Sequence, residues 1–299
     1  MQRIRYPSSI LEVSVYKIAI LGCENSHANA FLEFIRDEER YHDIEVVGIF
    51  SIYPEAAQKL SEEFNVPVMD SFDACVGKVD GLMITARDGK YHYPYAKPYI
   101  ATGIPMFLDK PITNSQEDTI ALVADLKANN VSVCGGSTMR YAPYLEELKK
   151  VIADGGMGKC LGGYFRAPVS LVNEYGNFFF YSAHNVSMMT EIFGYYPKSV
   201  YACKSGNSLD CVVAYENVNV HLQYIIGSSA YYAMVAMEKG MVSSKVEFGG
   251  YATEFEQFYS ILTGKDTGED YTDLTASVFI LNAINRSMET GEVVAIESL

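Results

Sequence analysis

Residues 16–36, YKIAILGCENSHANAFLEFIR, limit the folds open to this chain more than any other stretch. Residues 18–21 form an apolar run long enough for a buried parallel strand, and Gly22 ends it. Ser26 is suited to cap a helix, because apolar residues recur beyond it at helical spacing. A strand, a glycine turn and a helix in this order open a dinucleotide-binding unit, where the first N–H groups of the helix bind a pyrophosphate.

The glycine fingerprint of such units, G-x-G-x-x-G, is incomplete here. Gly22 fills the first position, whereas Glu24 and His27 replace the second and third glycines. The Glu24 charge would repel a phosphate unless its side chain points away. The loop alone leaves two interpretations open: a nucleotide site formed by Gly22, Glu24, Asn25, Ser26 and His27, or an ordinary βαβ unit.

The first half of the chain alternates strand and helix patterns, which predicts a doubly wound parallel sheet in an α/β domain. Pro67 predicts an edge position or a poorly paired start for the third predicted strand, because proline cannot donate to a ladder. The predicted strands are 18–21, 44–50, 66–69, 79–85, 105–108 and 131–134, and the predicted helices are 26–36, 54–64, 91–102 and 115–129.

The pattern changes after Gly136, where strand-like runs separated by Gly and Asn predict an α+β domain with an antiparallel sheet. We place a Rossmann-like domain at 1–138, with 1–15 as an extension, and a substrate and oligomerisation domain at 139–299. The predicted strands are 161–165, 199–203, 211–215, 218–226, 230–237 and 241–248, and the predicted helices are 144–153, 182–193, 253–262 and 273–290.

Composition narrows the class of protein. The 299 residues are 49% hydrophobic and 20% charged, as in soluble globular proteins, and the formal charge of −14 argues against nucleic acid or an anionic membrane as partner. No apolar run approaches the length of a membrane span, and the start of the chain lacks the features of a signal peptide. Six scattered cysteines predict free thiols in a reducing cytoplasm, and no metal site is expected.

Four landmarks follow in an order that is informative as a set. They are Asp109-Lys110-Pro111 after a predicted strand, the segment 138–143, the turn 156–159, and His184 with Gly194 downstream. This order resembles the Gfo/Idh/MocA family of oxidoreductases over nearly the whole chain. The resemblance implies an N-terminal Rossmann domain and a C-terminal domain with an open, mostly antiparallel sheet. The open face usually makes a subunit contact in that family, which implies a homodimer or homotetramer.

The resemblance also implies a reaction. Lys110 and His184 would face a nicotinamide as the catalytic pair of an NAD(P)-dependent oxidoreductase acting on a sugar, polyol or related hydroxy compound. His184 is the expected base, because hydride leaves a carbinol carbon only as the hydroxyl proton is removed. Lys110 would stabilise the charge that develops on the same oxygen. Thr85, His92 and Lys110 would also line the cofactor.

Other positions depart from the family pattern. Phe180 and Ser187 stand where acidic residues would orient His184, and Glu174 or Tyr181 are the substitutes we weigh. Ser51 occupies the position of the acid that binds the adenosine ribose, which slightly favours NADP over NAD. Two alternatives therefore stay open: a non-catalytic cofactor- or sugar-binding regulatory protein, and a redox-neutral, glycosidase-like relative.

Overall fold

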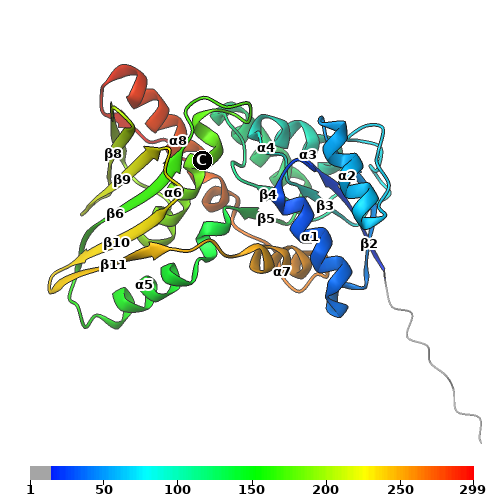
Figure 1. The fold of residues 1–299 in the computed structure, drawn as a ribbon, viewed down its shortest axis with the longest axis horizontal. Helices are drawn as coiled ribbons and strands as arrows, with labels where there is room; N and C mark the ends of the chain where they lie inside the picture. The colour runs from blue at the N-terminus through cyan, green and yellow to red at the C-terminus, as the bar shows by residue number, and fades with distance from the viewer. Residues whose placement is uncertain (1–14) are drawn as a thin grey trace, which may run out of the picture.

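The structure, a computed structural model, describes residues 15–299, and the predicted extension at 1–15 lies almost wholly outside them. Two β-sheets stand at opposite ends of the molecule, with helices between and around them (Figure 1). The first half contains β1 (Tyr16–Leu21), α1 (Ser26–Asp37), β2 (Ile44–Phe50), α2 (Pro54–Phe64), β3 (Gly81–Ile84), α3 (His92–Ile100), β4 (Met106–Asp109), α4 (Gln116–Asn129) and β5 (Val133–Gly136), with short 3₁₀ turns at Glu39–Tyr41 and Gly89–Tyr91.

The first sheet is parallel throughout, in the order β2-β1-β3-β4-β5, which confirms the predicted Rossmann-like half. Strands β3, β4 and β5 are fully buried, and β1 is buried from Ile18 to Leu21, as expected for a sheet covered on both faces. Gly22 has φ +105°, and a Cβ there would lie 2.1 Å from the backbone nitrogen of Ala86. The loop after β3 therefore crosses the end of β1 so closely that only glycine fits.

The predicted strand at 66–69 is wrong as a full strand. Only a single parallel bridge joins Val68 to Ile49, at the free edge of β2 where Pro67 placed the segment. The Ile49 amide donates to the Pro67 carbonyl, and the Met69 amide donates to the Ile49 carbonyl. Pro67 has no N–H to extend the ladder, so the pairing stops there.

The second half begins with a 3₁₀ turn (Thr138–Tyr141). Its sheet has seven strands in the order β11-β10-β6-β9-β8-β7-β12 and is antiparallel except for the parallel β6–β9 pair, so the α+β prediction is confirmed. The elements are α5 (Pro143–Asp154), β6 (Cys160–Val169), α6 (Phe178–Phe193), β7 (Ser199–Ser205), β8 (Ser208–Ala214), β9 (Asn219–Ile226), β10 (Tyr231–Met237), β11 (Gly240–Val246), α7 (Tyr251–Leu262), α8 (Tyr271–Thr290) and β12 (Val294–Ala295).

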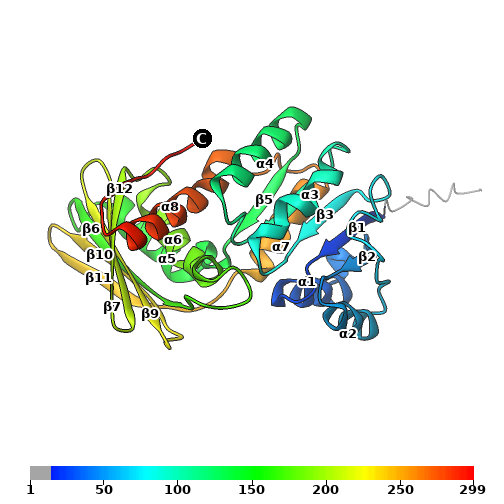
Figure 2. The same ribbon diagram turned by 90° about the horizontal axis from the view of Figure 1, so that it is seen from above.

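The helices of the second half cover one face of its sheet. In Figure 2, α5, α6 and α8 lie between this sheet and the Rossmann half, and no helix of residues 15–299 covers the outer face. Helix α7 crosses back to the first half, where Phe255 and Phe258 join the core around Phe31 and Phe107. The chain therefore passes between the two halves more than once, and α6 and α7 bring second-half side chains to the edge of the parallel sheet.

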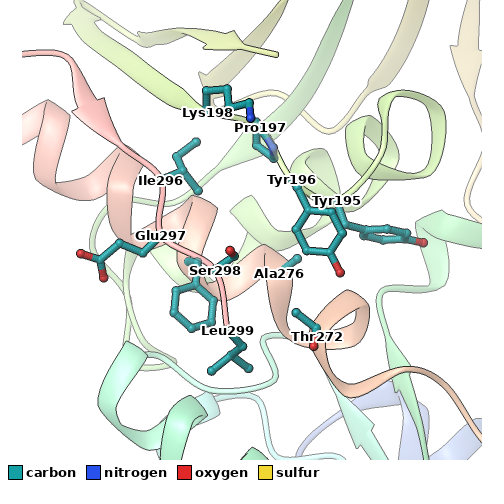
Figure 3. Close-up of a pocket in the computed structure, with 11 residues that line it drawn as sticks. Tyr195, Tyr196, Pro197, Lys198, Thr272, Ala276, Ile296, Glu297, Ser298 and Leu299 are labelled. Atoms are coloured by element: carbon teal, nitrogen blue, oxygen red, sulfur yellow. The ribbon is translucent and has the colours of Figure 1, made fainter. Parts of the chain in front are cut away.

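The C-terminal segment closes a small cavity of about 220 Å³ against Tyr195, Tyr196 and the start of α8 (Figure 3). Ile296 and Leu299 line its other side, and it contains neither Lys110 nor His184. The six cysteines are free thiols within the described part of the chain, as predicted. In residues 15–299, no helix combines the length and apolar character needed to cross a membrane, and the cytoplasmic location stays a prediction.

Candidate active site

Lys110 and His184, predicted as the catalytic pair, line one cavity of about 390 Å³ between the two halves of the molecule. Lys110 comes directly after β4 of the parallel sheet, and His184 lies on α6 of the second half. Asn25 and Ser26, at the start of α1, border the same cavity. The carboxyl edge of the parallel sheet is where ligands bind in open α/β folds, so the cavity is in the expected place.

The Lys110 side chain is nearly buried, with 6% of its surface exposed. Its Nζ lies 4.5 Å from the centroid of the Phe180 ring, so an aromatic face stands where a carboxylate was expected. Burial lowers the pKa of Lys110, and the neighbouring Asp109 opposes this only in part. The Lys110–Pro111 peptide bond is cis. The geometry leaves an amine in the cavity that loses its proton more readily than an exposed lysine does.

His184 is oriented by a serine. Nδ1 of His184 lies 2.7 Å from the hydroxyl oxygen of Ser137, which directly follows β5. The same oxygen accepts a hydrogen bond from the backbone N–H of Met139 at 3.2 Å. Ser137 is fully buried, and among residues 15–299 Nδ1 of His184 is the one group that its hydroxyl proton can reach, so we assign Ser137 as the donor. The proton of neutral His184 then resides on Nε2, and burial lowers the pKa of the imidazole well below its usual value.

The predicted substitute partners of His184 are not its partners in the structure. Tyr181 lies beside the imidazole with the ring centroids 6.4 Å apart, and Glu174 is exposed in the loop before α6. Ser187 lies on α6 and is nearly buried, and its carbonyl accepts from the Thr190 hydroxyl. The role expected for a carboxylate therefore falls to Ser137.

The Glu24 side chain turns away from the start of α1 and toward the ends of β2 and β3. Its Oε2 accepts a hydrogen bond of 2.6 Å from the Ser51 hydroxyl, and its Oε1 accepts one of 3.2 Å from the backbone N–H of Arg87. Ser51 is 6% exposed, and its hydroxyl oxygen also accepts from the Tyr53 amide. The carboxylate of Glu24, which replaces a fingerprint glycine, is thus held beside Ser51 at the end of β2.

His27, at the third fingerprint position, is buried in a polar cluster beneath the loop. Its Nε2 lies 3.4 Å from Oδ1 of Asp109 and 3.2 Å from Oε2 of Glu254, which comes from α7. Asn25 donates to Asp109 at 2.5 Å, and its own oxygen lies 3.3 Å from Nδ1 of His27. The cluster ties the loop to β4 and α7, and His27, although 2% exposed, also lines the cavity of Lys110 and His184.

Burial favours the neutral forms in this cluster. It raises the pKa of Asp109 to about 7 and the pKa of Glu254 well above its ordinary value, and it lowers the pKa of His27. Asp109 and Glu254 are both fully buried. The cluster therefore adds little net charge beneath the phosphate end of the groove.

The start of α1 is open to a phosphate. Asn25, not Ser26 as predicted, is the N-cap residue, and its side chain makes no capping hydrogen bond because it is bound to Asp109. The first N–H groups of the helix are thus left for a ligand or solvent. Ser26 is exposed, and its hydroxyl lies 2.8 Å from that of Tyr251. These features fit a pyrophosphate at α1 even with one fingerprint glycine.

Two other predicted cofactor residues are placed beneath the site. Thr85 is fully buried, and its hydroxyl donates to the Gly22 carbonyl at 2.9 Å. His92 is also fully buried, and its Nε2 lies 2.7 Å from the Ala86 carbonyl. Both brace the loops around Gly22, so a contribution to cofactor binding, which stays a prediction, would act through those loops.

The loop before α6 reaches over the first half. The ring of Tyr175 stacks under the guanidinium of Arg87, with 4.8 Å from Cζ to the centroid, and lies 6.4 Å from the ring of Tyr53. Tyr53 follows Ser51 at the end of β2.

Sequence reasoning missed Ser137, Glu254 and Tyr251 and assigned no role to Asp109. Ser137 and Asp109 lie at carboxyl ends of parallel strands, a position that marks candidate site residues. Glu254 and Tyr251 lie on a helix far along the chain, and no local pattern ties that helix to α1. Among residues 15–299, no group of three or more His, Cys, Asp or Glu side chains is arranged to hold a metal ion.

The comparisons with known proteins agree with this architecture. Residues 16–136 match the family model described as "Oxidoreductase family, NAD-binding Rossmann fold", GFO_IDH_MocA. Inositol 2-dehydrogenase of Corynebacterium glutamicum strain R is 26% identical over 115 residues, which are 37% of this chain and 34% of that protein. The sequence match thus spans about a third of this relative. The match of residues 16–136 to the model of the Gfo/Idh/MocA oxidoreductases agrees with the family resemblance that the motif order predicted.

Solved structures extend the likeness in fold to both halves. Scyllo-inositol dehydrogenase from Lactobacillus casei, solved with NAD(H) and scyllo-inositol, has a TM-score of 0.80 at 16% identity and covers 94% of this chain and 99% of its own. Myo-inositol 2-dehydrogenase from Lactobacillus plantarum has a TM-score of 0.80 at 14% identity, covering 95% of this chain and 100% of its own. The comparisons give no support to a regulatory or glycosidase-like function.

Proposed function

We propose that this protein is an NAD(P)-dependent oxidoreductase that acts on a small sugar, polyol or related hydroxy compound. The observation that carries the proposal is the convergence of Lys110 and His184 on one cavity beside the uncapped start of α1. The match of residues 16–136 to an oxidoreductase family described by its NAD-binding Rossmann fold supports the same reaction class. Bound along the parallel sheet, the cofactor would accept or return the hydride.

The structure favours reversed roles for the two catalytic residues. With Nδ1 accepting from Ser137, His184 presents an N–H to the cavity and holds the substrate oxygen as a donor. Within residues 15–299 no ion pair joins Nζ of Lys110 to a carboxylate, and burial lowers the pKa of Lys110 more than Asp109 raises it, so its neutral amine takes the hydroxyl proton. In the reverse direction the ammonium group of Lys110 returns that proton to the carbonyl oxygen.

The lining of the cavity supports a polyhydroxylated substrate. Aromatic rings of Phe180, Phe248 and Tyr231 offer faces for C–H groups, and Ser228 and Ser229 offer hydroxyls for hydrogen bonds. Relatives in the comparisons are named inositol dehydrogenases, which agrees with a ring bearing several hydroxyl groups.

The outer face of the second sheet is our proposed subunit contact, in a homodimer or homotetramer. Tyr164, Arg166, Tyr232 and Met234 line a hollow of about 480 Å³ on it, and in the described part of the chain no helix covers this face (Figure 2). Light scattering of the purified protein tests the proposal, and a monomer at all concentrations would oppose it.

Titration of the purified protein with NADH and NADPH, followed by fluorescence, tests the proposed activity. Binding should be followed by substrate-dependent change at 340 nm across a panel of inositols, sugars and acyclic polyols. Absence of binding by either cofactor at millimolar concentration would reject the proposal. Binding without turnover on any member of the panel would leave a cofactor-binding protein and reject the enzymatic part.

A further inference from the structure

We propose that Glu24 supplies the acid that receives the adenosine ribose hydroxyls, so that the protein selects NAD(H) over NADP(H). The inference rests on the proposed function, because it requires a dinucleotide in the groove. In this chain the ribose acid comes from the glycine loop and not from the end of β2. Glu24 takes the place of a fingerprint glycine, and its carboxylate serves as the ribose-binding acid that is missing at the end of β2.

The first observation is positional. Ser51 directly follows β2, where a dinucleotide-binding unit normally presents the carboxylate that binds the ribose 2′-hydroxyl. The Glu24 carboxylate lies 2.6 Å from the Ser51 hydroxyl, so an acidic group occupies the neighbourhood of the absent one. The serine was the reason to favour NADP, and this contact removes that reason.

The second observation is how firmly the carboxylate is held. One of its oxygens accepts from Ser51 and the other from the backbone N–H of Arg87, so the side chain spans the ends of β2 and β3. Each oxygen retains a further lone pair, and Glu24 is only partly buried. The carboxylate can therefore accept additional hydrogen bonds from ligand hydroxyls while it keeps its protein donors.

The third observation is that, in the described part of the chain, no cationic side chain pairs with the Glu24 carboxylate. Within residues 15–299, no Lys, Arg or His nitrogen lies within 4.0 Å of the Glu24 carboxylate. The Arg87 guanidinium stacks on Tyr175 instead, and Lys59 of α2 lines a cavity together with Glu24 but forms no ion pair with it in the described residues. A 2′-phosphate carries about −1.5 to −2 charges and would meet this unneutralised carboxylate. Ribose hydroxyls meet an acceptor, whereas the phosphate meets a like charge.

The test measures binding, not turnover. For wild-type protein, calorimetric or fluorescence titration should give a Kd for NADH at least about tenfold below that for NADPH. Adenosine 5′-monophosphate should compete with NADH, and adenosine 2′,5′-bisphosphate should compete more weakly. Glu24→Gln keeps an acceptor for Ser51 or Arg87 but removes the charge, so the NADPH-to-NADH ratio of Kd should fall by roughly tenfold. Glu33→Gln, an equal change of net charge on α1, should leave the ratio unchanged.

Several results would overturn the inference while the proposed function stands. The first is a wild-type preference for NADPH, and the second is a ratio of Kd values that Glu24→Gln leaves unchanged. The third is a Glu24→Gln protein whose affinity for both cofactors rises by the same factor, which would mean that the carboxylate had blocked the groove. Loss of NADPH binding on Lys59→Gln, in a wild type that prefers NADPH, would place the 2′-phosphate on α2. Failure of the wild type to bind either cofactor would reject the proposed function itself. The two adenosine nucleotides test the wild type directly, so the outcome does not depend on the folding of a variant.

Discussion

The hydroxyl oxygen of Ser137 lies 2.7 Å from Nδ1 of His184, and it joins the end of β5 to α6 across the two halves of the molecule. The contact fixes both the orientation of the imidazole and the nitrogen that carries its proton. The Ser137 oxygen also accepts from the Met139 amide, and its hydroxyl proton, which needs an acceptor in this buried place, is assigned to Nδ1 of His184.

Ser137→Ala is therefore expected to lower kcat by about tenfold, the equivalent of one lost hydrogen bond, with little change in the Kd for NADH. The imidazole would then exchange between tautomers and rotate. Ser137→Thr retains the hydroxyl and should recover part of the lost kcat. Equal loss in both variants, or an unchanged kcat in Ser137→Ala, would mean that the contact is structural only.

Substitution of Lys110 separates a base from a fixed positive charge. Lys110→Met should lower kcat by about 10²- to 10⁴-fold, the usual contribution of general acid–base catalysis. Lys110→Arg should be as inactive, because a guanidinium does not release its proton near neutral pH. Steady-state rates with NADH binding as the control decide this. Substantial activity in Lys110→Arg would assign the base role to His184, as first expected from the family resemblance.

Phe180→Asp tests the aromatic neighbour of Lys110. An anionic carboxylate close to Nζ, which now lies 4.5 Å from the Phe180 centroid, would favour the ammonium form and raise the pKa of Lys110. Since the base must be neutral to accept a proton, the acid limb of the kcat/KM profile should move to higher pH by roughly one unit or more. Phe180→Leu, which adds no charge, should leave the limb in place. An unmoved limb in Phe180→Asp would show that Lys110 is not the group that titrates.

His92 should make stability depend on pH. Burial lowers its pKa to about 4, whereas an unfolded histidine titrates near 6.5. Its contribution is therefore present above pH 6.5 and is lost as the pH falls from about 6.5 toward about 4, by about 3 kcal/mol in all. Urea unfolding at pH 7.5, 6.0 and 5.0 should show a steeper loss for wild type than for His92→Gln. His221→Gln, at an exposed position on β9, should lose stability with falling pH as the wild type does. If His92→Gln shows the same pH dependence as the wild type, His92 is not a source of that dependence.

How much of this could be predicted from the sequence depends on how local each feature is. The strand that ends at Gly22, the helix that follows it, and Lys110 after β4 are encoded by neighbouring residues. Parallel strands then bring their carboxyl ends to one edge without further information. His184 required the order of motifs, because no periodic pattern relates α6 to β4.

Features that depend on side-chain direction or on distant segments were beyond that reasoning. Glu24 was recognised as a misplaced charge, but its contact with Ser51 depends on a rotamer chosen between two strand ends. Glu254 meets His27 only because α7 crosses back to the first half. The strand expected at 66–69 is a single bridge in the structure, because Pro67 cannot extend a ladder. The presence of proline already indicated this limit in the sequence.

Glu254 offers a test of the buried cluster as a whole. Its carboxyl group is fully buried, and burial raises its pKa well above the ordinary value. The folded protein therefore keeps the carboxyl proton at a pH, above about 4.3, where the unfolded chain releases it. Stability from this group is thus fully present below about pH 4.3 and is lost as the pH rises toward the folded pKa. The glutamine of Glu254→Gln has no proton to lose. The free energy of unfolding of this variant, relative to that of the wild type, should therefore increase as the pH is raised from 4 to 8. Denaturant unfolding across this range measures the difference, with Glu289→Gln, exposed on α8, as the matched control. A difference between wild type and Glu254→Gln that stays constant with pH would mean that the carboxyl is ionised in the folded protein, and Lys110 would then have a counter-ion after all.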